Sequence, residues 1–169
     1  NARVAAQRDQ WRARSSLDHD DPDRALHLHL GPGEAQLSLD GSGGSLHRRG
    51  YRAAMGAAPL KENLAAGLIR LTGWDGSQPL VDPCCGSGVL LIEAALAALQ
   101  QAPGLERHFA LEGWADFQPD LWDREADRAR QRRRGDLTLP QLLGIEEDPS
   151  IADQARANVE AAGLSGVIR

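Results

Sequence analysis

The spacing of apolar residues along the chain predicts its strands and helices. Apolar residues alternate with polar ones on both sides of a Gly-Pro-Gly turn, at Leu26, Leu28, Leu30, Ala35, Leu37 and Leu39. A period of two that is interrupted by such a turn predicts a β-hairpin over residues 25–40, and we expect one face of it to be buried. Residues 1–14 are typical of the end of a helix, which a polar cluster at residues 18–22 terminates.

A helical period replaces this alternation in the middle of the chain. Leucines three and four residues apart predict a helix that Pro59 opens and Gly73 ends, and they are Leu60, Leu64, Leu68 and Leu71. Residues 79–81 then form a short apolar strand, residues 82–88 a turn with two glycines, and residues 89–99 a strongly apolar helix.

The same order of elements returns in the last third of the chain. We expect a helix of mixed charge over residues 122–134, a buried strand over 139–146, a helix over 150–162 and the beginning of a third strand at 166–169. Strands that alternate with helices are typical of a parallel sheet, so the predicted fold class is α/β.

Length and composition fit one folded domain. The chain has 169 residues, of which 41% are hydrophobic and 25% charged, and no apolar run is long enough to cross a membrane. We expect an N-terminal helix end, hairpin and basic loop over residues 1–52, and the first half of an α/β domain over residues 53–169 with an insertion at 101–139. Because the net charge is -5, any contact with a nucleic acid must be local.

Two adjacent cysteines, Cys84 and Cys85, cannot staple distant segments, and no second cysteine pair or paired histidine completes a metal site. We expect small buried residues rather than nucleophiles, since no neighbouring base would generate a thiolate. Their use predicts a reducing, cytoplasmic setting. The first residues hold neither an initiator Met nor an apolar leader, which is typical of a fragment.

The turn at residues 82–88 is the candidate ligand site, because ligands of parallel α/β sheets bind beyond the carboxyl ends of the strands. A phosphate-binding loop needs a lysine where Val89 and Leu90 stand, and the dinucleotide fingerprint needs a third glycine where Leu91 stands. A nucleoside ligand without phosphates, carrying an amino acid end, remains, and S-adenosylmethionine has this description. Glu146, at the end of the next strand, would accept hydrogen bonds from its ribose.

These segments resemble the RNA methylase family, and within it the THUMP-associated, RlmL-type 23S rRNA guanine-N2 methyltransferases. The similarity runs from about Asp18 to the end of the chain. It rests on the lead-in at residues 40–52, Pro-Leu-Lys-Glu-Asn-Leu-Ala-Ala at 59–66, Asp-Pro-Cys-Cys-Gly-Ser-Gly at 82–88, Leu-Ile-Glu-Ala-Ala at 91–95, the aromatic stretch 103–122, Gly-Ile-Glu-Glu-Asp-Pro at 144–149, Ala-Arg-Ala-Asn at 155–158 and Ala-Gly-Leu at 162–164.

The resemblance implies a Rossmann-like, class I methyltransferase fold that is incomplete at its C-terminal side. It implies that Asp82 and the backbone of Cys84, Gly86, Ser87 and Gly88 hold the methionine end of S-adenosylmethionine, and that Glu146 holds the ribose. It further implies an activity on the N2 amine of a guanine in large-subunit rRNA. The motif that holds the target amine would lie beyond Arg169, and a THUMP domain would precede Asn1.

The sequence departs from the family pattern at three positions and leaves other functions open. Cys84 stands where the family often has Met, Val89 where it often has Thr, and Glu146 where it more often has Asp. An adenine-N6 DNA or RNA methyltransferase shares this style of loop, and a non-catalytic RNA-binding or assembly module is a second alternative. No metal or membrane partner is expected.

Several of these features also have structural interpretations. Asp82 could cap the turn, with Gly86 and Gly88 as plain turn residues. The register of the resemblance favours Glu146 over Glu147 as the ribose acceptor. The basic segment at residues 47–52 could contact RNA, with Tyr51 stacked on a base, or be a solvated surface. The arginines at 128–134 fit surface ion pairing at least as well as RNA binding.

Overall fold

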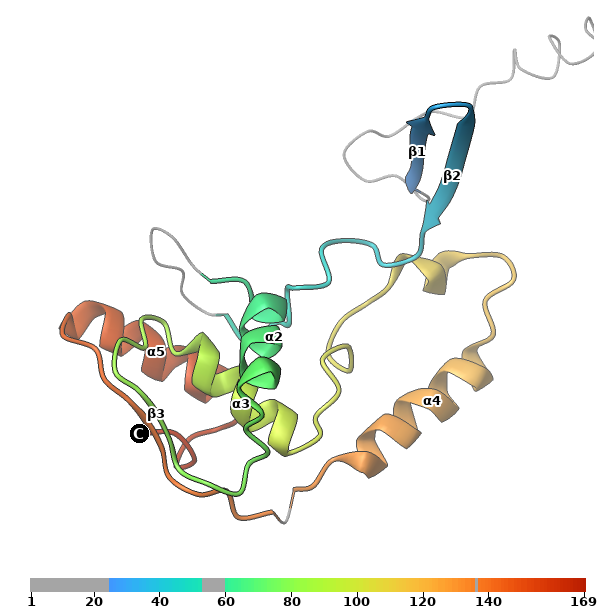
Figure 1. The fold of residues 1–169 in the computed structure, drawn as a ribbon. Helices are drawn as coiled ribbons and strands as arrows, with labels where there is room; N and C mark the ends of the chain where they lie inside the picture. Colours follow the sequence, from blue (N-terminus) through green and yellow to red (C-terminus); the bar gives the residue numbers. More distant parts are fainter. Residues whose placement is uncertain (1–24, 53–59, 136) are drawn as a thin grey trace, which may run out of the picture. The chain divides into compact units, whose positions relative to one another are not determined.

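The computed structural model describes residues 25–52, 60–135 and 137–169. The helix end predicted at residues 1–14 and the cluster at 18–22 lie outside the described residues. The elements, shown in Figure 1, are β1 (Ala25–Gly31), β2 (Glu34–Asp40), α2 (Glu62–Thr72), β3 (Leu80–Asp82), α3 (Val89–Ala98), the 3-10 turn η1 (Ala110–Gly113), α4 (Pro119–Arg132), β4 (Leu142–Gly144) and α5 (Pro149–Ala161).

The chain divides into two compact units. The described part of the first consists of residues 25–43 and 109–115, and it contains the hairpin. The second spans residues 44–108 and 116–169 apart from the gaps given above, and it contains the parallel strands and the helices around them. The basic segment at residues 47–52 belongs to this second unit.

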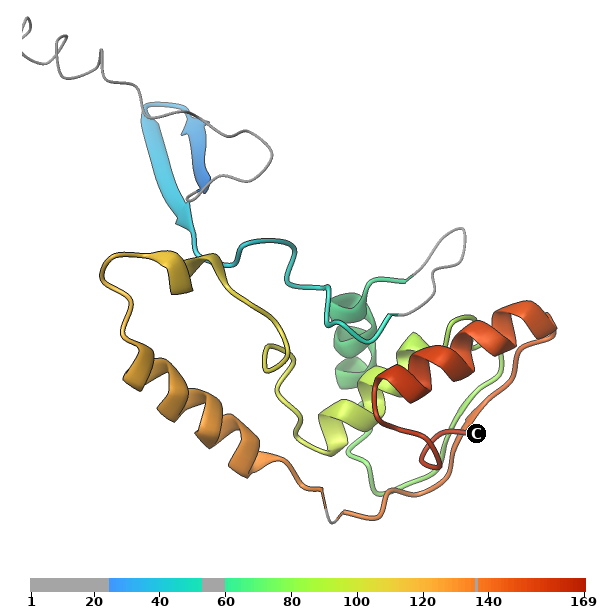
Figure 2. The ribbon, with the colours of Figure 1, turned by 180° about the vertical axis from the view of Figure 1, so that it is seen from behind.

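The hairpin forms as the alternation predicts. β1 pairs antiparallel with β2, so that Leu26 lies opposite Leu39 and Leu28 opposite Leu37, and Figure 2 shows the two strands side by side, joined by their turn. Gly33 adopts the positive φ of +81° that the turn requires. The expectation of a buried face was wrong, because the leucines of this face are 43–70% exposed in the described structure. Alternation reports which residues share a face, and it does not report what covers that face.

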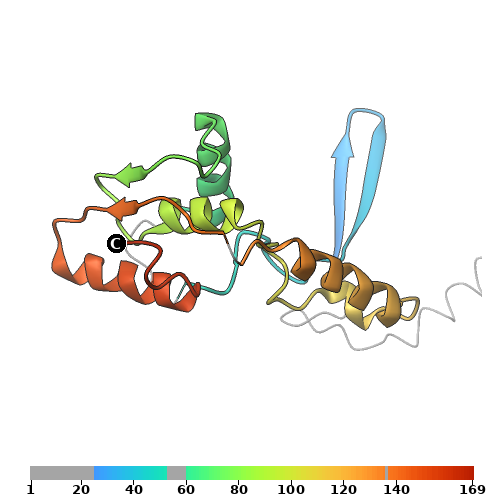
Figure 3. The same ribbon diagram turned by 90° about the horizontal axis from the view of Figure 1, so that it is seen from below.

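The α/β unit is built around the parallel pair of β3 and β4, in which Asp82 lies opposite Gly144. Helix α3 packs against α2 and against α5, as Figures 1 and 3 show. Of the third strand expected at residues 166–169, the structure shows an isolated parallel bridge of Ile168 with Leu142 after a turn at residues 166–167, and the Gly144 amide donates to the Arg169 carbonyl at 2.7 Å.

The helices follow from their apolar patterns. α2 ends at Gly73, whose φ of +73° closes the helix in the left-handed conformation. Apart from Glu93, α3 is apolar on all sides, as is typical of an enclosed helix, and seven of its ten residues are buried. α4 begins at Pro119, three residues before the expected position, because proline suits the first turn of a helix. β4 is shorter than the expected 139–146, and Pro140 has no amide with which to extend the ladder.

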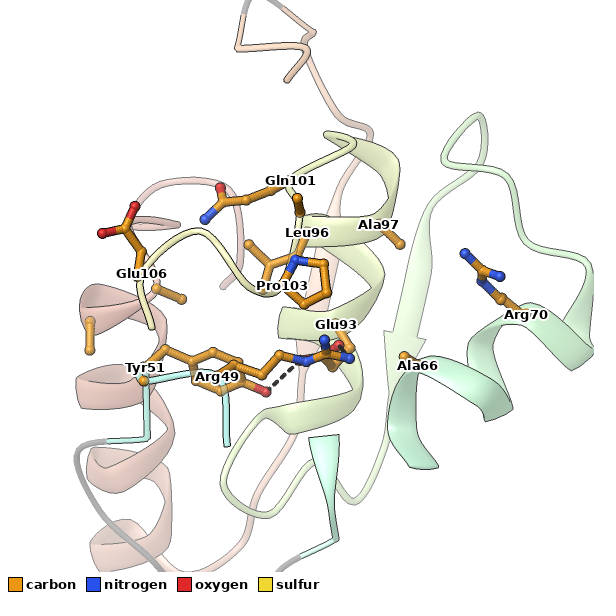
Figure 4. A pocket seen from close by; sticks show the side chains of 14 residues that line it. Arg49, Tyr51, Ala66, Arg70, Glu93, Leu96, Ala97, Gln101, Pro103 and Glu106 are labelled. Atoms are coloured by element: carbon orange, nitrogen blue, oxygen red, sulfur yellow. Dashed lines mark hydrogen bonds and ion pairs between the residues drawn. The ribbon is translucent and has the colours of Figure 1, made fainter. Parts of the chain in front are cut away.

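A buried ionic network ties the basic segment to the helices. Glu93 of α3 accepts hydrogen bonds from the Tyr51 hydroxyl at 3.0 Å and from the Arg49 guanidinium, with which it forms an ion pair at 3.1 Å. Figure 4 shows Arg49 and Tyr51 converging on this carboxylate. Arg52 binds Glu62 at 3.0 Å and the Leu60 carbonyl at 2.6 Å, which holds the start of α2 against the segment.

This network corrects part of the RNA-binding interpretation of the basic segment, the stacking of Tyr51 on a base, and leaves contact of the exposed Arg48 with RNA a prediction. Tyr51 is only 6% exposed, so it is not available to stack on a base, and the guanidinium groups of Arg49 and Arg52 neutralise buried carboxylates. Burial raises the pKa of Glu93, and the charge of Arg49 opposes this effect. Burial and the Glu93 charge raise the pKa of Tyr51, so its hydroxyl remains a hydrogen-bond donor.

We expect Arg49→Met to lower the free energy of unfolding by about 3–5 kcal/mol, because it leaves Glu93 buried and without its cation. The unpaired carboxyl would then bind a proton more tightly in the folded state, so the loss should diminish as the pH falls through its raised pKa. Urea denaturation at several pH values measures this. The double variant Arg49→Met with Glu93→Gln removes both charges and should recover most of the loss; a double variant as unstable as the single one contradicts the assignment.

Candidate functional site

The glycine loop at residues 83–88 connects the carboxyl end of β3 to α3, and hydrogen bonds hold it against the end of β4. The Ile145 amide donates to the Asp82 carbonyl at 2.9 Å, and the Cys85 amide donates to the Ile145 carbonyl at 2.9 Å. Inside the loop, the Gly88 amide donates to the Cys85 carbonyl at 2.8 Å. The carboxyl ends of two parallel strands therefore meet at this loop, which is where α/β folds bind their ligands.

The two glycines of the loop do different things. Both have positive φ, +53° at Gly86 and +79° at Gly88, a conformation that side chains disfavour. A Cβ on Gly86 would meet no atom within 4 Å, whereas a Cβ on Gly88 would lie 3.5 Å from the Cβ of Ala155. Gly86 thus presents open backbone for the approach of a ligand, and Gly88 faces α5.

Glu146, and not its neighbour Glu147, reaches the glycine loop. One carboxylate oxygen of Glu146 accepts a hydrogen bond from the Gly86 amide at 3.1 Å, and the other accepts one from the Asp148 amide at 3.1 Å. Glu146 is half-buried, and Glu147 is exposed. Each carboxylate oxygen can accept a second hydrogen bond, so Glu146 keeps capacity for a ligand beside Gly86.

Asp82 has one satisfied and one unsatisfied oxygen. Its Oδ1 accepts a hydrogen bond from the Cys84 amide at 3.2 Å, which is the capping contact of the structural interpretation. Its Oδ2 is buried and has no hydrogen-bond partner among the residues that the structure describes. A buried carboxylate oxygen without a partner is costly, and a ligand that brings a donor would satisfy it.

Asn158 of α5 and Gly144 of β4 support the loop, and sequence analysis gave neither a role. The Asn158 side chain is 1% exposed, and its amide donates to the Ser87 carbonyl at 3.1 Å. A Cβ on Gly144 would lie 2.9 Å from the Cys85 Sγ and 3.1 Å from a methyl group of Leu91. A glycine at the end of a strand is the signal that could have indicated Gly144, whereas nothing in the pattern of α5 distinguishes Asn158 from the other polar residues of the helix.

The cysteines differ from each other. Cys84 is exposed, so the prediction that it is a small buried residue was wrong, while Cys85 is half-buried against Gly144. Burial raises the pKa of the Cys85 thiol, and the charges of Asp82 and Glu146 raise it further. Cys85 therefore stays a neutral thiol at physiological pH, as expected of a packing residue.

A cavity of about 430 Å³ lies beside the loop. Cys85, Gly144 and Glu146 line it on one side, and Ala155 and Arg156 of α5 are among the residues on the other. Within the described ranges no cluster of three His, Cys, Asp or Glu side chains could hold a metal ion. None of the helices in these ranges has the length and apolar character to span a membrane.

The sequence matches a known family over most of its length. The pattern of the UPF0020 family, described as the RMKL-like methyltransferase domain, matches residues 49–169. This range includes the buried ionic network, the glycine loop and Glu146, and it leaves the hairpin outside.

Curated relatives are longer than this chain. The chain is 44% identical over 169 residues to a protein of Synechocystis sp. named “Putative RNA methyltransferase slr0064”, with 99% of this chain and 44% of the relative covered. It is 46% identical over 168 residues to the ribosomal RNA large subunit methyltransferase K/L of Syntrophotalea carbinolica, with 96% of this chain and 24% of the relative covered. The chain thus spans less than half the length of these relatives.

Solved structures share the fold. The crystal structure of SMU.472, described as “a putative methyltransferase complexed with SAH”, superposes with a TM-score of 0.83 at 34% identity, covering 99% of this chain and 44% of that one. The structure of “a predicted N6-adenine-specific DNA methylase” from Listeria monocytogenes superposes with a TM-score of 0.83 at 35% identity, covering 98% and 43%. The Rossmann-like methyltransferase fold expected from the sequence is confirmed, as is the family resemblance.

We expect Gly144→Ala to destabilise the protein by about 1–3 kcal/mol, because its Cβ would overlap Cys85 and Leu91. Gly67→Ala in α2 is the matched control, since a Cβ there meets no atom within 4 Å and alanine favours a helix, so it should stabilise by up to about 1 kcal/mol. Thermal unfolding compares the two. Adding Cys85→Ala to Gly144→Ala should recover part of the lost free energy of unfolding. If the double variant is as unstable as Gly144→Ala alone, contact with Cys85 is not the cause of the destabilisation.

Proposed function

The chain belongs to the RMKL-like methyltransferase domain family, and we propose that it forms the cofactor-binding part of an S-adenosylmethionine-dependent RNA methyltransferase. The observation that carries this proposal is the buried, unpartnered Oδ2 of Asp82 at a glycine loop to which Glu146 is hydrogen-bonded. The loop has no lysine for phosphates, so the site suits a nucleoside that carries hydrogen-bond donors at both ends.

The residues fit S-adenosylmethionine by their chemistry. Asp82 Oδ2 would accept a hydrogen bond from the ammonium group of the methionine end, beside the loop backbone of Cys84, Gly86, Ser87 and Gly88. Glu146 would accept hydrogen bonds from the ribose hydroxyls, with the lone pairs that Gly86 and Asp148 leave unused. When bound, the cofactor supplies an electrophilic methyl group. The SAH in the crystal structure of SMU.472 supports the choice of cofactor.

Within this chain, Asn158 and Gly144 contribute by positioning. Asn158 fixes the Ser87 carbonyl and Gly144 admits Cys85, so the loop is held in shape by the neighbouring strand and helix. A loop that is already ordered requires less conformational entropy when a ligand binds. Methyl transfer then depends on aligning the target amine with the cofactor, and alignment of two bound reactants accelerates a reaction without covalent catalysis by the protein.

For the substrate we propose the N2 amine of a guanine in 23S rRNA. The names of the K/L relatives support large-subunit rRNA as the substrate class, and the resemblance of residues 40–52 and 82–88 to the RlmL-type enzymes supports guanine. In the same proposal, a THUMP domain binds the RNA and a separate motif holds the target amine. The Listeria monocytogenes neighbour, described as an N6-adenine-specific DNA methylase, favours an adenine amine as the second candidate.

Labelled methyl transfer distinguishes these candidates. The intact protein, which in this proposal includes the THUMP domain and the motif that holds the target amine, would be incubated with methyl-labelled cofactor and either unmodified 23S rRNA or duplex DNA, and the product digested to nucleosides. We expect the label in N2-methylguanosine from rRNA. Label in N6-methyladenosine from either nucleic acid would establish the second candidate, and cofactor binding without transfer to any nucleic acid would contradict both.

We expect Glu146→Ala to weaken the binding of S-adenosylhomocysteine by about ten- to a hundredfold, because charged hydrogen bonds of this kind contribute about 1.5–3 kcal/mol. Glu147→Ala is the matched control, and a surface substitution of this kind should change the affinity by less than about twofold. Isothermal titration calorimetry measures both. If Glu147→Ala weakened binding and Glu146→Ala did not, the ribose contact would belong to the other residue.

A further inference from the structure

Helix α4 and the residues after it segregate charge along their length. Residues 119–127 hold four acidic residues and one arginine, whereas residues 128–134 hold five arginines and no acid. This concentration stands out in a chain whose net charge is -5. The short segment is the most basic part of the chain, and its arginines are Arg128, Arg130, Arg132, Arg133 and Arg134.

Ion pairing accounts for only the first two of these arginines. Arg128 pairs with Glu125, and Arg130 pairs with Asp127 at 2.8 Å, in exposed contacts one helical turn apart. Arg132, Arg133 and Arg134 are exposed and form no ion pair with any other residue that the structure describes. We call these three residues the arginine triplet.

Backbone hydrogen bonds hold the arginine triplet against the α/β unit. The Arg134 amide donates to the Leu99 carbonyl at 2.8 Å, just past the end of α3, and the Arg134 carbonyl accepts from the Leu137 amide at 3.1 Å. α3 spans ten residues, which corresponds to about 15 Å. Because the glycine loop lies at the start of α3 and the triplet is anchored at its end, the triplet is placed to contact a macromolecule and not the small ligand of the loop.

Stabilisation of α4 by its own dipole explains the position of some of these charges but not their number. Basic residues favour the end of a helix, and Arg130 and Arg132 already occupy the last turn. Arg133 and Arg134 lie beyond Arg132, the last residue of the helix, where the same charge repeats without an acidic partner among the described residues. Three adjacent exposed guanidinium groups repel one another, so their placement favours a polyanionic partner.

RNA fits this surface better than an anionic membrane does. Membrane-surface helices bury a large apolar face, and the exposed large hydrophobic residue of α4 is Leu121, near the opposite end of the helix from the triplet. Guanidinium groups bind phosphates through paired hydrogen bonds, and a run of three can follow successive phosphates of one strand. We propose that the arginine triplet binds the RNA backbone at a distance from the modified nucleotide, which would lie at the glycine loop beyond the other end of α3. This inference rests on the proposed RNA methyltransferase function.

The test compares two triple variants, one at the end of α4 and just after it and one within α4. Arg132→Ala, Arg133→Ala and Arg134→Ala together remove the triplet, and Arg124→Ala, Arg128→Ala and Arg130→Ala together remove the same charge from the positions next to acids. Fluorescence anisotropy with a labelled 23S rRNA fragment would give the affinity at several salt concentrations. We expect the first variant to lose at least about tenfold in affinity and to lower the salt dependence by about two to three counterions, and the second to lose less than about threefold.

Two further measurements separate this inference from the proposed function. Titration with S-adenosylhomocysteine should give the same affinity for wild type and both variants, and circular dichroism should show equal helix content. Equal losses of RNA affinity in the two variants, or no RNA binding by the wild type, would overturn the inference. Binding of anionic phosphatidylserine vesicles that disappears in the triplet variant, with RNA binding unchanged, would overturn it in favour of a membrane. A wild type that binds RNA through the triplet but binds no cofactor would refute the proposed function alone.

Discussion

The parallel pairing of β3 with β4 is the interaction on which the candidate site depends. It places Asp82 opposite Gly144, so the segments that follow the two strands leave the sheet side by side. The Ile145 amide then donates to the Asp82 carbonyl, and the Cys85 amide donates to the Ile145 carbonyl. The Gly86 amide donates to the carboxylate of Glu146. Two carboxylates that are 64 positions apart in the sequence thus serve one loop, although each strand has only three residues. The arrangement requires glycine at position 144, because a side chain there would clash with Cys85 and displace it.

Sequence analysis predicted the elements of the α/β unit well because local patterns determine them. The leucine period and Gly73 define α2, and Pro149 with Gly163 brackets α5. The order of strands and helices then implies parallel pairing, and parallel pairing implies that the loop after β3 and the acid after β4 are neighbours. Topology alone places Asp82 and the acids after β4 beside one loop, whereas the choice of Glu146 over Glu147 rested on the register of the family resemblance. Their contacts with a cofactor stay predictions.

Features that depend on contacts between distant segments could not be predicted in this way. The buried ion pair of Arg49 with Glu93 joins residues 44 positions apart, and that of Arg52 with Glu62 joins residues 10 positions apart. A basic run in the sequence does not indicate which carboxylates it will pair with in the folded protein. The exposed leucines of the hairpin are the opposite case, because their pattern is that of a buried face. Asn158 and Gly144 belong to segments that carry the family resemblance, but neither was given a role, since each acts on a loop that is remote in sequence.

Glu93 and Asp82 illustrate how a fold distinguishes structure from function. Glu93 meets Arg49 and Tyr51, so its burial is compensated within the chain and its substitution should affect stability first. Asp82 lies at the mouth of a turn with one oxygen bonded and the other buried without a partner in the described structure. A buried oxygen without a hydrogen bond raises the free energy of the protein without its ligand. A ligand that donates a hydrogen bond to this oxygen would remove that cost, so such an oxygen is typical of a binding site. The unsatisfied oxygen of Asp82 is therefore an indication of a binding site that is independent of the glycine pattern of the loop.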